Sequence, residues 1–214
     1  MATGRWFEVR ALLEAAASTT TAQSQLNAVL RAVEGARSAP TLLDPLWTMP
    51  GHLAQSGPLT TSVAHLVDGA RCSVTCSTFI LQRTSELWSS LRQAARRPEI
   101  AARVCLDTRA ADHGSSGRSP TTAEVAKHLR PATVLQTKEF DGGYVRTHAK
   151  FLAVRHRFLL VTSANFPWST ENNNIEFGVL IDNPNLAEAV ERELLQAEHS
   201  LYERVVDRSS EGAR

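Results

Sequence analysis

The sequence predicts an α/β fold, a layered sandwich in which helices cover a mixed sheet. From residue 59 onward, short apolar runs rich in β-branched residues alternate with segments whose apolar residues recur at helical spacing. The last three apolar runs follow one another without a helix, so part of the sheet is expected to be antiparallel. We expect about six strands. A chain of 214 residues with 43% apolar content can bury one good core.

Three regions are expected along the chain. Residues 1–40 are predicted to be an N-terminal helical segment, residues 41–208 the α/β domain, and residues 209–214 a frayed tail. The helical segment is indicated as a hairpin by Trp6, Val9, Leu13 and Ala16 in its first half and by Leu26, Val29, Leu30 and Val33 in its second. A hairpin of this kind packs on its own domain or serves as a docking arm for a partner.

The elements of the α/β domain are predicted in order from these patterns. Residues 36–60, rich in Pro, Gly, Ser and Thr, are expected to connect the two parts, with a possible extended piece at 46–50. Strands are predicted at 72–81, 103–107 and 133–136, and again within 147–181. Helices are predicted at 60–68, after the capping residue Ser85, at 119–129 and from 183 to 205, and a polar loop at 108–119.

Composition and charge narrow the setting of the protein. The formal net charge of +1 means that any nucleic-acid-binding surface needs a local concentration of arginines. Cys72, Cys76 and Cys105 form no C-x-x-C pair, which favours a reducing cytoplasm, and we expect no metal site. No apolar run approaches the ~20 residues that cross a bilayer, and the N-terminus lacks an apolar signal-peptide core. We therefore expect a cytoplasmic protein without membrane contact.

The candidate chemistry lies in residues 147–181. His148 and Lys150 stand two residues apart at the start of an apolar run, Ser163 and Asn165 follow the next run, and Glu176 precedes the third. On a strand, residues two apart face the same side. Three short strands are therefore expected to bring an imidazole, an ammonium, a hydroxyl, an amide and a carboxylate towards one pocket.

These groups suit reactions at a phosphodiester. The imidazole of His148 can attack phosphorus and form a covalent intermediate, while Lys150 and Asn165 stabilise the charged oxygens. Glu176 or the Ser163 hydroxyl can hold the other ring nitrogen. The strand-end residue Asp107 is expected to be structural. Three arginines near the motif are candidates for phosphate contacts or are solvated turn residues: Arg146, Arg155 and Arg157.

The pattern resembles the HKD signature of the phospholipase D superfamily, H-x-K-x4-D-x6-G-S-x-N. His148, Lys150, Ser163 and Asn165 match it in identity and spacing, whereas Arg155 replaces the Asp and Thr162 the Gly. The likeness spans about residues 59–206 and is specific around the motif. The run TSANFPWSTENNNIEFGVLI is similar to the single-motif, nuclease-like branch and, more narrowly, to the phospholipase D-like DrmC component of DISARM anti-phage systems.

The resemblance implies a phospholipase D-like α/β/α sandwich and a metal-independent phosphodiesterase that needs no cofactor. It implies a nuclease that cleaves nucleic acid, DNA rather than RNA, through a phosphohistidine intermediate in anti-phage defence. Two alternatives stay open. The domain can be a catalytically silent nucleic-acid-binding or scaffold subunit of a defence complex, or a phospholipase, although no apolar interfacial helix is evident.

The count of histidines predicts a homodimer. The phosphohistidine route uses one histidine as nucleophile and a second as general acid. None of the other histidines is followed by a lysine two residues later, so the chain carries a single H-x-K. A two-fold dimer would place His148 of each subunit in one shared active site. Other defence-system subunits are further expected partners.

Overall fold

The computed structural model describes residues 24–27, 29–30, 41–49, 59–112, 119–164 and 174–205. The chain divides into two compact units, Met1–Pro40 and Thr41–Arg214. In the first unit, residues 24–27 and 29–30 are helical, and the rest of the predicted hairpin lies outside the described residues. The predicted tail at 209–214 lies outside them as well. The fold below is that of the second unit.

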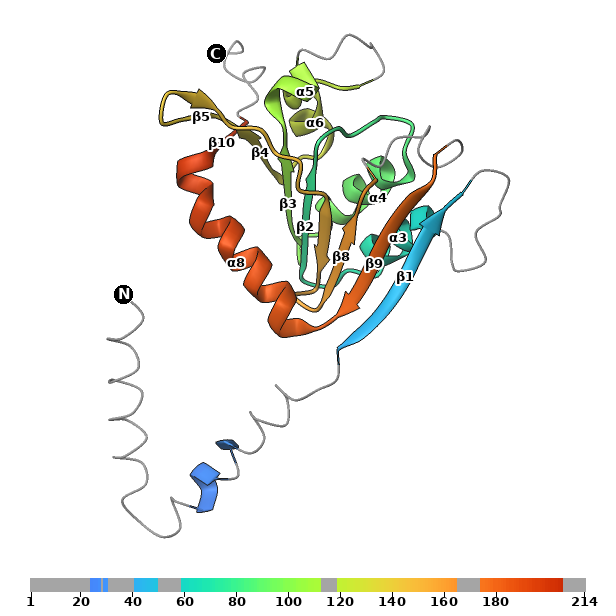
Figure 1. The fold of residues 1–214 in the computed structure, drawn as a ribbon, viewed down its shortest axis with the longest axis vertical. Helices are drawn as coiled ribbons and strands as arrows, with labels where there is room; N and C mark the ends of the chain where they lie inside the picture. Colours follow the sequence, from blue (N-terminus) through green and yellow to red (C-terminus); the bar gives the residue numbers. More distant parts are fainter. Residues whose placement is uncertain are drawn as a thin grey trace. The chain divides into compact units, whose positions relative to one another are not determined.

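Eight strands of the described residues form one mixed sheet in the order β1-β9-β8-β7-β2-β3-β4-β10 (Figure 1). Their bounds are Leu42–Thr48 (β1), Ser73–Thr78 (β2), Ala101–Leu106 (β3), Thr133–Thr137 (β4), Phe151–Val154 (β7), Phe158–Thr162 (β8), Glu176–Asp182 (β9) and Tyr202–Arg204 (β10). The neighbours β2, β3 and β4 are parallel, and every other pair is antiparallel. The strand β2 thus pairs in parallel with β3 on one side and antiparallel with β7 on the other.

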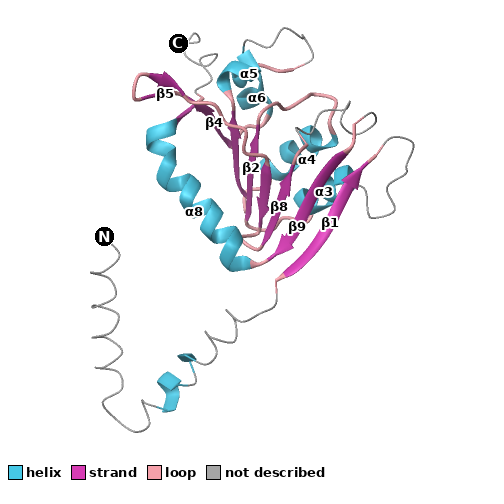
Figure 2. Cartoon of the chain, in the orientation of Figure 1, coloured by secondary structure: helices cyan, strands magenta, loops and turns pink. Residues whose placement is uncertain are grey.

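Helices cover both faces of this sheet (Figure 2). The helix α8 (Pro184–Leu201) lies along one face. The others lie on the opposite side or at the sheet end: Leu59–Asp68 (α3), Glu86–Ala95 (α4), Thr108–Asp112 (α5) and Thr122–His128 (α6). The main core packs residues of α3, α4 and α6 against the strands, and a smaller cluster joins Ala187 of α8 to Ala153 and Leu159. Within the described parts of the chain, no helix combines the length and apolar character needed to span a bilayer.

The strand β2 lies in the interior of the sheet, and its burial fits this position. All six of its residues are buried, as expected for a strand covered on both faces. Burial also raises the pKa of the Cys76 thiol to about 12.

On the antiparallel side, Gly178 lets β9 approach its neighbours closely. A Cβ at that position would lie 3.1 Å from Leu59 Cδ1 and 3.2 Å from the Val161 carbonyl oxygen.

The predicted fold class is confirmed, but two strands of the eight-stranded sheet were not predicted as strands. The segment expected to connect the two parts contains β1, which pairs with β9 from Leu42↔Asp182 to Thr48↔Glu176. Only residues 46–50 of this segment were expected to be extended. Pro45 is tolerated in β1 because the strand lies at the sheet edge, where a missing N–H costs no ladder hydrogen bond. The other is β10, which pairs with β4 where the final helix was expected to continue to Val205. Helix α8 instead ends at Leu201.

Three local predictions also need correction. The loop predicted at 108–119 begins with a short helix, α5. The helix predicted to open at Ser119-Pro120 starts later, because Thr121 is the N-cap of α6 and forms a capping box with Glu124. The irregular stretch before the motif contains a two-stranded ribbon, Glu139–Phe140 (β5) and Gly143–Tyr144 (β6).

Candidate active site

The motif residues lie at the edge of the sheet where β2 and β3 end. His148 and Lys150 were expected on a strand, but they precede β7, in the connection that follows β6. Strand-like pairing nevertheless reaches Lys150, because the Thr162 N–H donates to its carbonyl oxygen at 3.1 Å. The Lys150 ammonium lies 3.4 Å from the carbonyl oxygen of His148. His148 and Lys150 therefore share one short segment, in which His148 is exposed and Lys150 is half-buried.

Ser163 and Glu176 meet at the same edge, from β8 and β9. The Ser163 hydroxyl donates to the Glu176 carboxylate and accepts from the Phe177 N–H at 3.1 Å. The Ser163 N–H in turn donates to the Phe177 carbonyl oxygen at 2.9 Å. The structure thus brings these two predicted site residues into direct contact. Asn165 lies outside the described residues.

Thr162, which stands where the HKD signature has Gly, fits its position through its hydroxyl. The hydroxyl donates to the Phe177 carbonyl oxygen at 3.2 Å and accepts from the Ala164 N–H at 3.0 Å. The side chain is 9% exposed, so both polar contacts replace contacts with water. This departure from the signature therefore closes the end of β8 without leaving a buried polar group unpaired.

The imidazole of His148 is held by an aromatic ring. It stacks on Phe79, which follows β2, with ring centroids 4.6 Å apart and an interplanar angle of 22°. Sequence reasoning left two groups open as partners of the ring nitrogen. Within the described parts of the chain, neither the Ser163 hydroxyl nor Glu176 hydrogen-bonds the ring; the two residues bind each other instead. Phe79 was missed by sequence reasoning.

Neighbouring strand ends fix the backbone on either side of His148. Asp107, directly after β3, is completely buried and accepts hydrogen bonds from Arg146 Nε and from the Thr147 N–H. The Ser77 hydroxyl of β2 donates to the Ala149 carbonyl oxygen at 2.9 Å. Burial raises the pKa of the Tyr202 phenol, and its hydrogen bond with the Thr147 side chain acts in the opposite direction. Ser77 and Tyr202 gave no signal in the sequence, since both look like ordinary strand residues.

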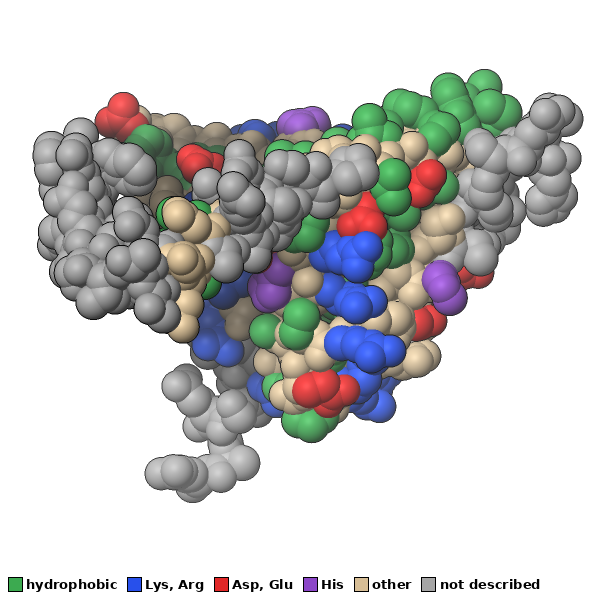
Figure 3. Space-filling view, turned by 90° about the horizontal axis from the view of Figure 1, so that it is seen from below, with side chains coloured by type: hydrophobic (Ala, Val, Ile, Leu, Met, Phe, Trp, Pro, Cys, Tyr) green, Lys and Arg blue, Asp and Glu red, His purple; other side chains and the backbone are tan. Residues whose placement is uncertain are grey.

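The structure does not bring Arg155 and Arg157 together with His148. Both lie in the β7–β8 turn, at the opposite end of these strands. Arg157 binds Asp182 through two hydrogen bonds of 2.6 Å, and Arg155 is exposed with a φ of +61°. Figure 3 views the molecule from this end, where Lys and Arg side chains form a row across the surface. Of the three predicted phosphate-binding arginines, only Arg146 lies beside the motif.

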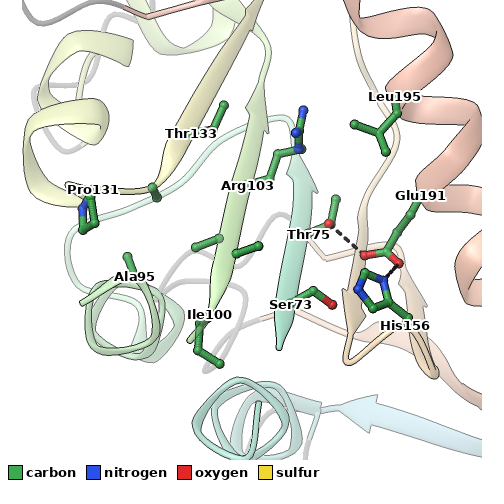
Figure 4. Close-up of a pocket in the computed structure, with 13 residues that line it drawn as sticks. Ser73, Thr75, Ala95, Ile100, Arg103, Pro131, Thr133, His156, Glu191 and Leu195 are labelled. Carbon is green, nitrogen blue, oxygen red and sulfur yellow. Dashed lines mark hydrogen bonds and ion pairs between the residues drawn. The ribbon is translucent and has the colours of Figure 1, made fainter. Parts of the chain in front are cut away.

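The same far end holds a separate pocket of about 320 Å³ on the α8 side of the sheet. There His156 Nδ1 lies 2.6 Å from the buried Glu191 carboxylate, which also accepts from the Thr75 hydroxyl at 2.9 Å (Figure 4). The contact ties the β7–β8 turn to α8. Among the described residues, no three or more His, Cys, Asp or Glu side chains gather as a metal-binding group.

Comparisons with known proteins agree with this architecture. A family model described as "Cardiolipin synthase, PLD-like domain" matches residues 63–197, more than half of the chain. No curated protein shows significant sequence similarity to this chain.

Solved structures of similar fold include a phospholipase D family member, Nuc from Salmonella typhimurium. It has a TM-score of 0.59 and 16% identity, and the match covers 78% of this chain and 99% of Nuc. NucT from Helicobacter pylori has a TM-score of 0.59 and 14% identity, with 76% and 98% covered. A phosphatidylserine synthase from Haemophilus influenzae has a TM-score of 0.58 and 15% identity, with 78% and 41% covered. These likenesses concern the fold. Together with the extent of the family match, they show that the chain belongs to the family of phospholipase D-like domains.

Proposed function

We propose that the protein is a metal-independent phosphodiesterase, a nuclease that cleaves nucleic acid through a phosphohistidine intermediate. The observation that supports the proposal is that His148 and Lys150 lie at the same end of the strands as Ser163 and Glu176. The two pairs are linked by the bond from the Thr162 N–H to the Lys150 carbonyl oxygen. An exposed imidazole beside an ammonium supplies a nucleophile and a positive charge for a negatively charged phosphorus centre. Asn165, which follows Ser163 in sequence, completes the proposed set.

The reaction proceeds in two displacements. One nitrogen of His148 attacks phosphorus, the P–N bond forms, and the bond to the leaving oxygen breaks. A second histidine gives its proton to that oxygen. This histidine then takes a proton from water, whose oxygen attacks phosphorus and releases His148. Lys150 and Asn165 bind the equatorial oxygens in both steps, and Arg146 draws the neighbouring phosphate into the site. Glu176 and Ser163 hold each other in place beside them.

The second histidine comes from another copy of the chain, so the working unit is a homodimer with a shared active site. Exposed apolar side chains beside the site support this proposal. Val161 and Phe177 are 47% and 40% exposed and lie on the α8 side of β8 and β9. We name these two residues the apolar strip. Pairing of two such strips would remove apolar surface from water next to Ser163 and Glu176.

The proposed setting is anti-phage defence in the cytoplasm, with DNA favoured over RNA and other defence proteins as further partners. The similarity of the motif run to the DrmC component supports the defence setting. The three cysteines are all free, which suits a reducing compartment. The setting is tested by plaque counts in cells that carry the wild-type or the His148→Ala gene within its native cluster. Equal protection by both genes would show that defence does not require the chemistry proposed for His148.

A lipid phosphodiester is the second candidate substrate. The matching family model is named for cardiolipin synthase, and the fold is shared with a phosphatidylserine synthase. The chemistry proposed for His148 applies to either kind of phosphodiester. A direct comparison of substrates therefore belongs in the first experiment.

That experiment incubates pure protein and EDTA with labelled single- and double-stranded DNA and RNA, and with phosphatidylglycerol vesicles. We expect cleavage of nucleic acid, with DNA preferred, and no loss of activity in chelator. His148→Ala should lower the rate by several orders of magnitude. His199→Ala is the matched control, because His199 is exposed on α8, and it should keep full activity. Activity lost in EDTA, or kept in His148→Ala, contradicts the proposal.

Two other outcomes identify the alternatives. Cleavage of the lipid alone would assign a phospholipase. Salt-sensitive nucleic-acid binding without cleavage in any variant would assign a silent binding subunit.

The shared site is tested by mixing chains. Wild-type protein, unfolded and refolded with excess His148→Ala chains, should lose activity as mixed dimers form, because each mixed dimer lacks one histidine. Activity proportional to the wild-type chains present, or a fully active monomer in sizing experiments, would show that each chain acts alone.

A further inference from the structure

Asp107 has an unusual set of contacts for a residue outside the motif. Its side chain is 0% exposed, and its Oδ1 accepts from the Ala110 N–H at 2.8 Å and from Arg146 Nε at 3.1 Å. Its Oδ2 accepts from Arg146 Nε at 2.9 Å and from the Thr147 N–H at 3.0 Å. Both carboxylate oxygens are therefore used, and two of the three donors belong to the residues directly before His148.

These contacts reach His148 by two routes. Through the backbone, the bond to the Thr147 N–H fixes the peptide unit next to His148. Through side chains, Asp107 holds the Arg146 guanidinium 5.4 Å from the ring centre of Phe79, and Phe79 stacks on the imidazole. Residues 145–150 belong to no helix or strand, so the position of His148 depends on such contacts.

We propose that Asp107 is the positioning residue of the active site, whose carboxylate fixes the backbone and ring of His148 for attack on phosphorus. The inference rests on the proposed function and concerns how the nucleophile is held. A misplacement of about 1 Å in a reacting group can cost about a hundredfold in rate. Asp107 touches no reacting atom. Because it also holds Arg146, the proposed phosphate contact, its loss should slow the chemical step far more than it weakens substrate binding.

A simpler role must be separated from this one. Asp107 precedes α5, and its bond to the Ala110 N–H is an N-cap contact. Asn and Ser are as good at an N-cap as Asp. In Asp107→Asn, the amide oxygen can still cap α5, but the amide nitrogen then faces the donors of Thr147 and Arg146. In Asp107→Ser, the hydroxyl can cap but is too short to replace both carboxylate oxygens. If capping is the whole role, both variants should behave as wild type.

The experiment measures single-turnover cleavage of a labelled DNA at saturating concentration, together with KM. For both Asp107→Asn and Asp107→Ser we expect a rate about 10–100-fold below wild type, with KM changed less than about threefold. Thr121→Ala is the matched control. It removes the N-cap of α6 and costs comparable stability without touching residues 145–150, so its rate should equal that of wild type.

Three results would overturn the inference: wild-type rates in the two Asp107 variants, an effect confined to KM, or an equal loss in Thr121→Ala. If the Asp107 variants do not fold, Arg146→Lys serves instead. It keeps the positive charge near the substrate but cannot reproduce the Nε contact with both carboxylate oxygens. We expect a several-fold lower single-turnover rate at saturating substrate, and an unchanged rate would contradict the proposal.

A readout without catalysis separates this inference from the proposed function. The imidazole protons of His148 should show ring-current shifts from Phe79 in NMR spectra, assigned by their absence in His148→Ala. In Asp107→Asn these signals should move towards the positions of an unstructured histidine. Unchanged signals would overturn the positioning role even if no substrate is cleaved. If the signals move but wild-type protein cleaves nothing, Asp107 does position His148 and the proposed nuclease activity is contradicted.

Discussion

The imidazole of His148 lies against Phe79, with ring centroids 4.6 Å apart and planes inclined by 22°. The contact joins the loop that carries the nucleophile to the end of the central strand β2. Phe79→Leu removes the flat surface that orients the ring, so we expect a fall of about tenfold in the single-turnover rate. Phe79→Tyr, which keeps the ring, should stay close to wild type. Equal rates in both variants would mean that the stack does not orient His148.

Arg155 carries a cost in backbone energy rather than a role at the site. Its φ of +61° and that of His156, +52°, place both residues in the left-handed region, which only Gly, Asn and Asp tolerate well. Arg155→Asn should raise the free energy of unfolding by about 0.5–1 kcal/mol, measured by urea denaturation. Cleavage of a short substrate should not change, because the turn lies at the far end of β7 and β8. Arg155→Asp should likewise leave the chemical step intact.

The thiols should differ sharply in reactivity. Burial raises the pKa of Cys76 and of Cys105 to about 12, so their thiolate fraction near neutral pH is negligible, whereas Cys72 is exposed. In native protein, a thiol reagent should modify Cys72 alone, and all three cysteines should react after denaturation. Peptide mapping identifies the modified residue. Rapid modification of Cys76 in native protein would show that β2 opens on the timescale of the reaction.

His128 should make the fold less stable in mild acid. Burial lowers its pKa from the ordinary 6.5, so below that pH the unfolded chain binds more protons than the folded one. The free energy of unfolding therefore falls as pH drops through this range. His128→Phe keeps the stack on Trp88, whose ring centroid lies 3.8 Å away, but cannot titrate. Between about pH 7.5 and about pH 5.5, Tm should drop less in the variant than in wild type. Equal drops would exclude His128 as the cause.

The apolar strip should carry the contact between two copies. A charge at Val161, which is 47% exposed, would have to be desolvated if two strips pack together. Val161→Glu should therefore shift the protein to monomer in analytical ultracentrifugation and abolish cleavage. Val161→Thr, of similar shape and uncharged, should stay dimeric. A wild-type protein that sediments as a monomer while active, or a dimeric Val161→Glu, would place the contact elsewhere or remove it.

The parts of the site that the sequence predicts are those joined by local geometry. His148 and Lys150 are two residues apart in the chain. Ser163 follows β8 and Glu176 begins β9, so their meeting follows from strand order alone. The same reasoning separates Arg155 from them. A strand of four residues rises about 13 Å, and therefore a residue after β7 lies far from one before it.

The contacts with Phe79 and Asp107 could not be predicted from spacing. They depend on which strands become neighbours, and the pairing of β2 with β7 joins segments of the chain far apart in sequence. The edge strand β1 was missed for another reason. The richness of residues 36–60 in Pro, Gly, Ser and Thr favoured a connection with at most an extended piece at 46–50, and pairing with β9 defines the strand.

The pairing of β2 with β7 also determines when the candidate site forms during folding. It brings Val74 to Val154 and Ser77 to Phe151, and pairings so distant in sequence form late because a long loop must close first. Residues 145–150, which carry His148, are held by contacts from both sides of this pairing. Phe79 and Asp107 lie on the β2 side, and Thr162 lies on the β7 side. A nascent or partly folded chain therefore carries every motif residue and still lacks the site. If the proposed nuclease activity is correct, such a delay confines cleavage of nucleic acid to chains that have finished folding.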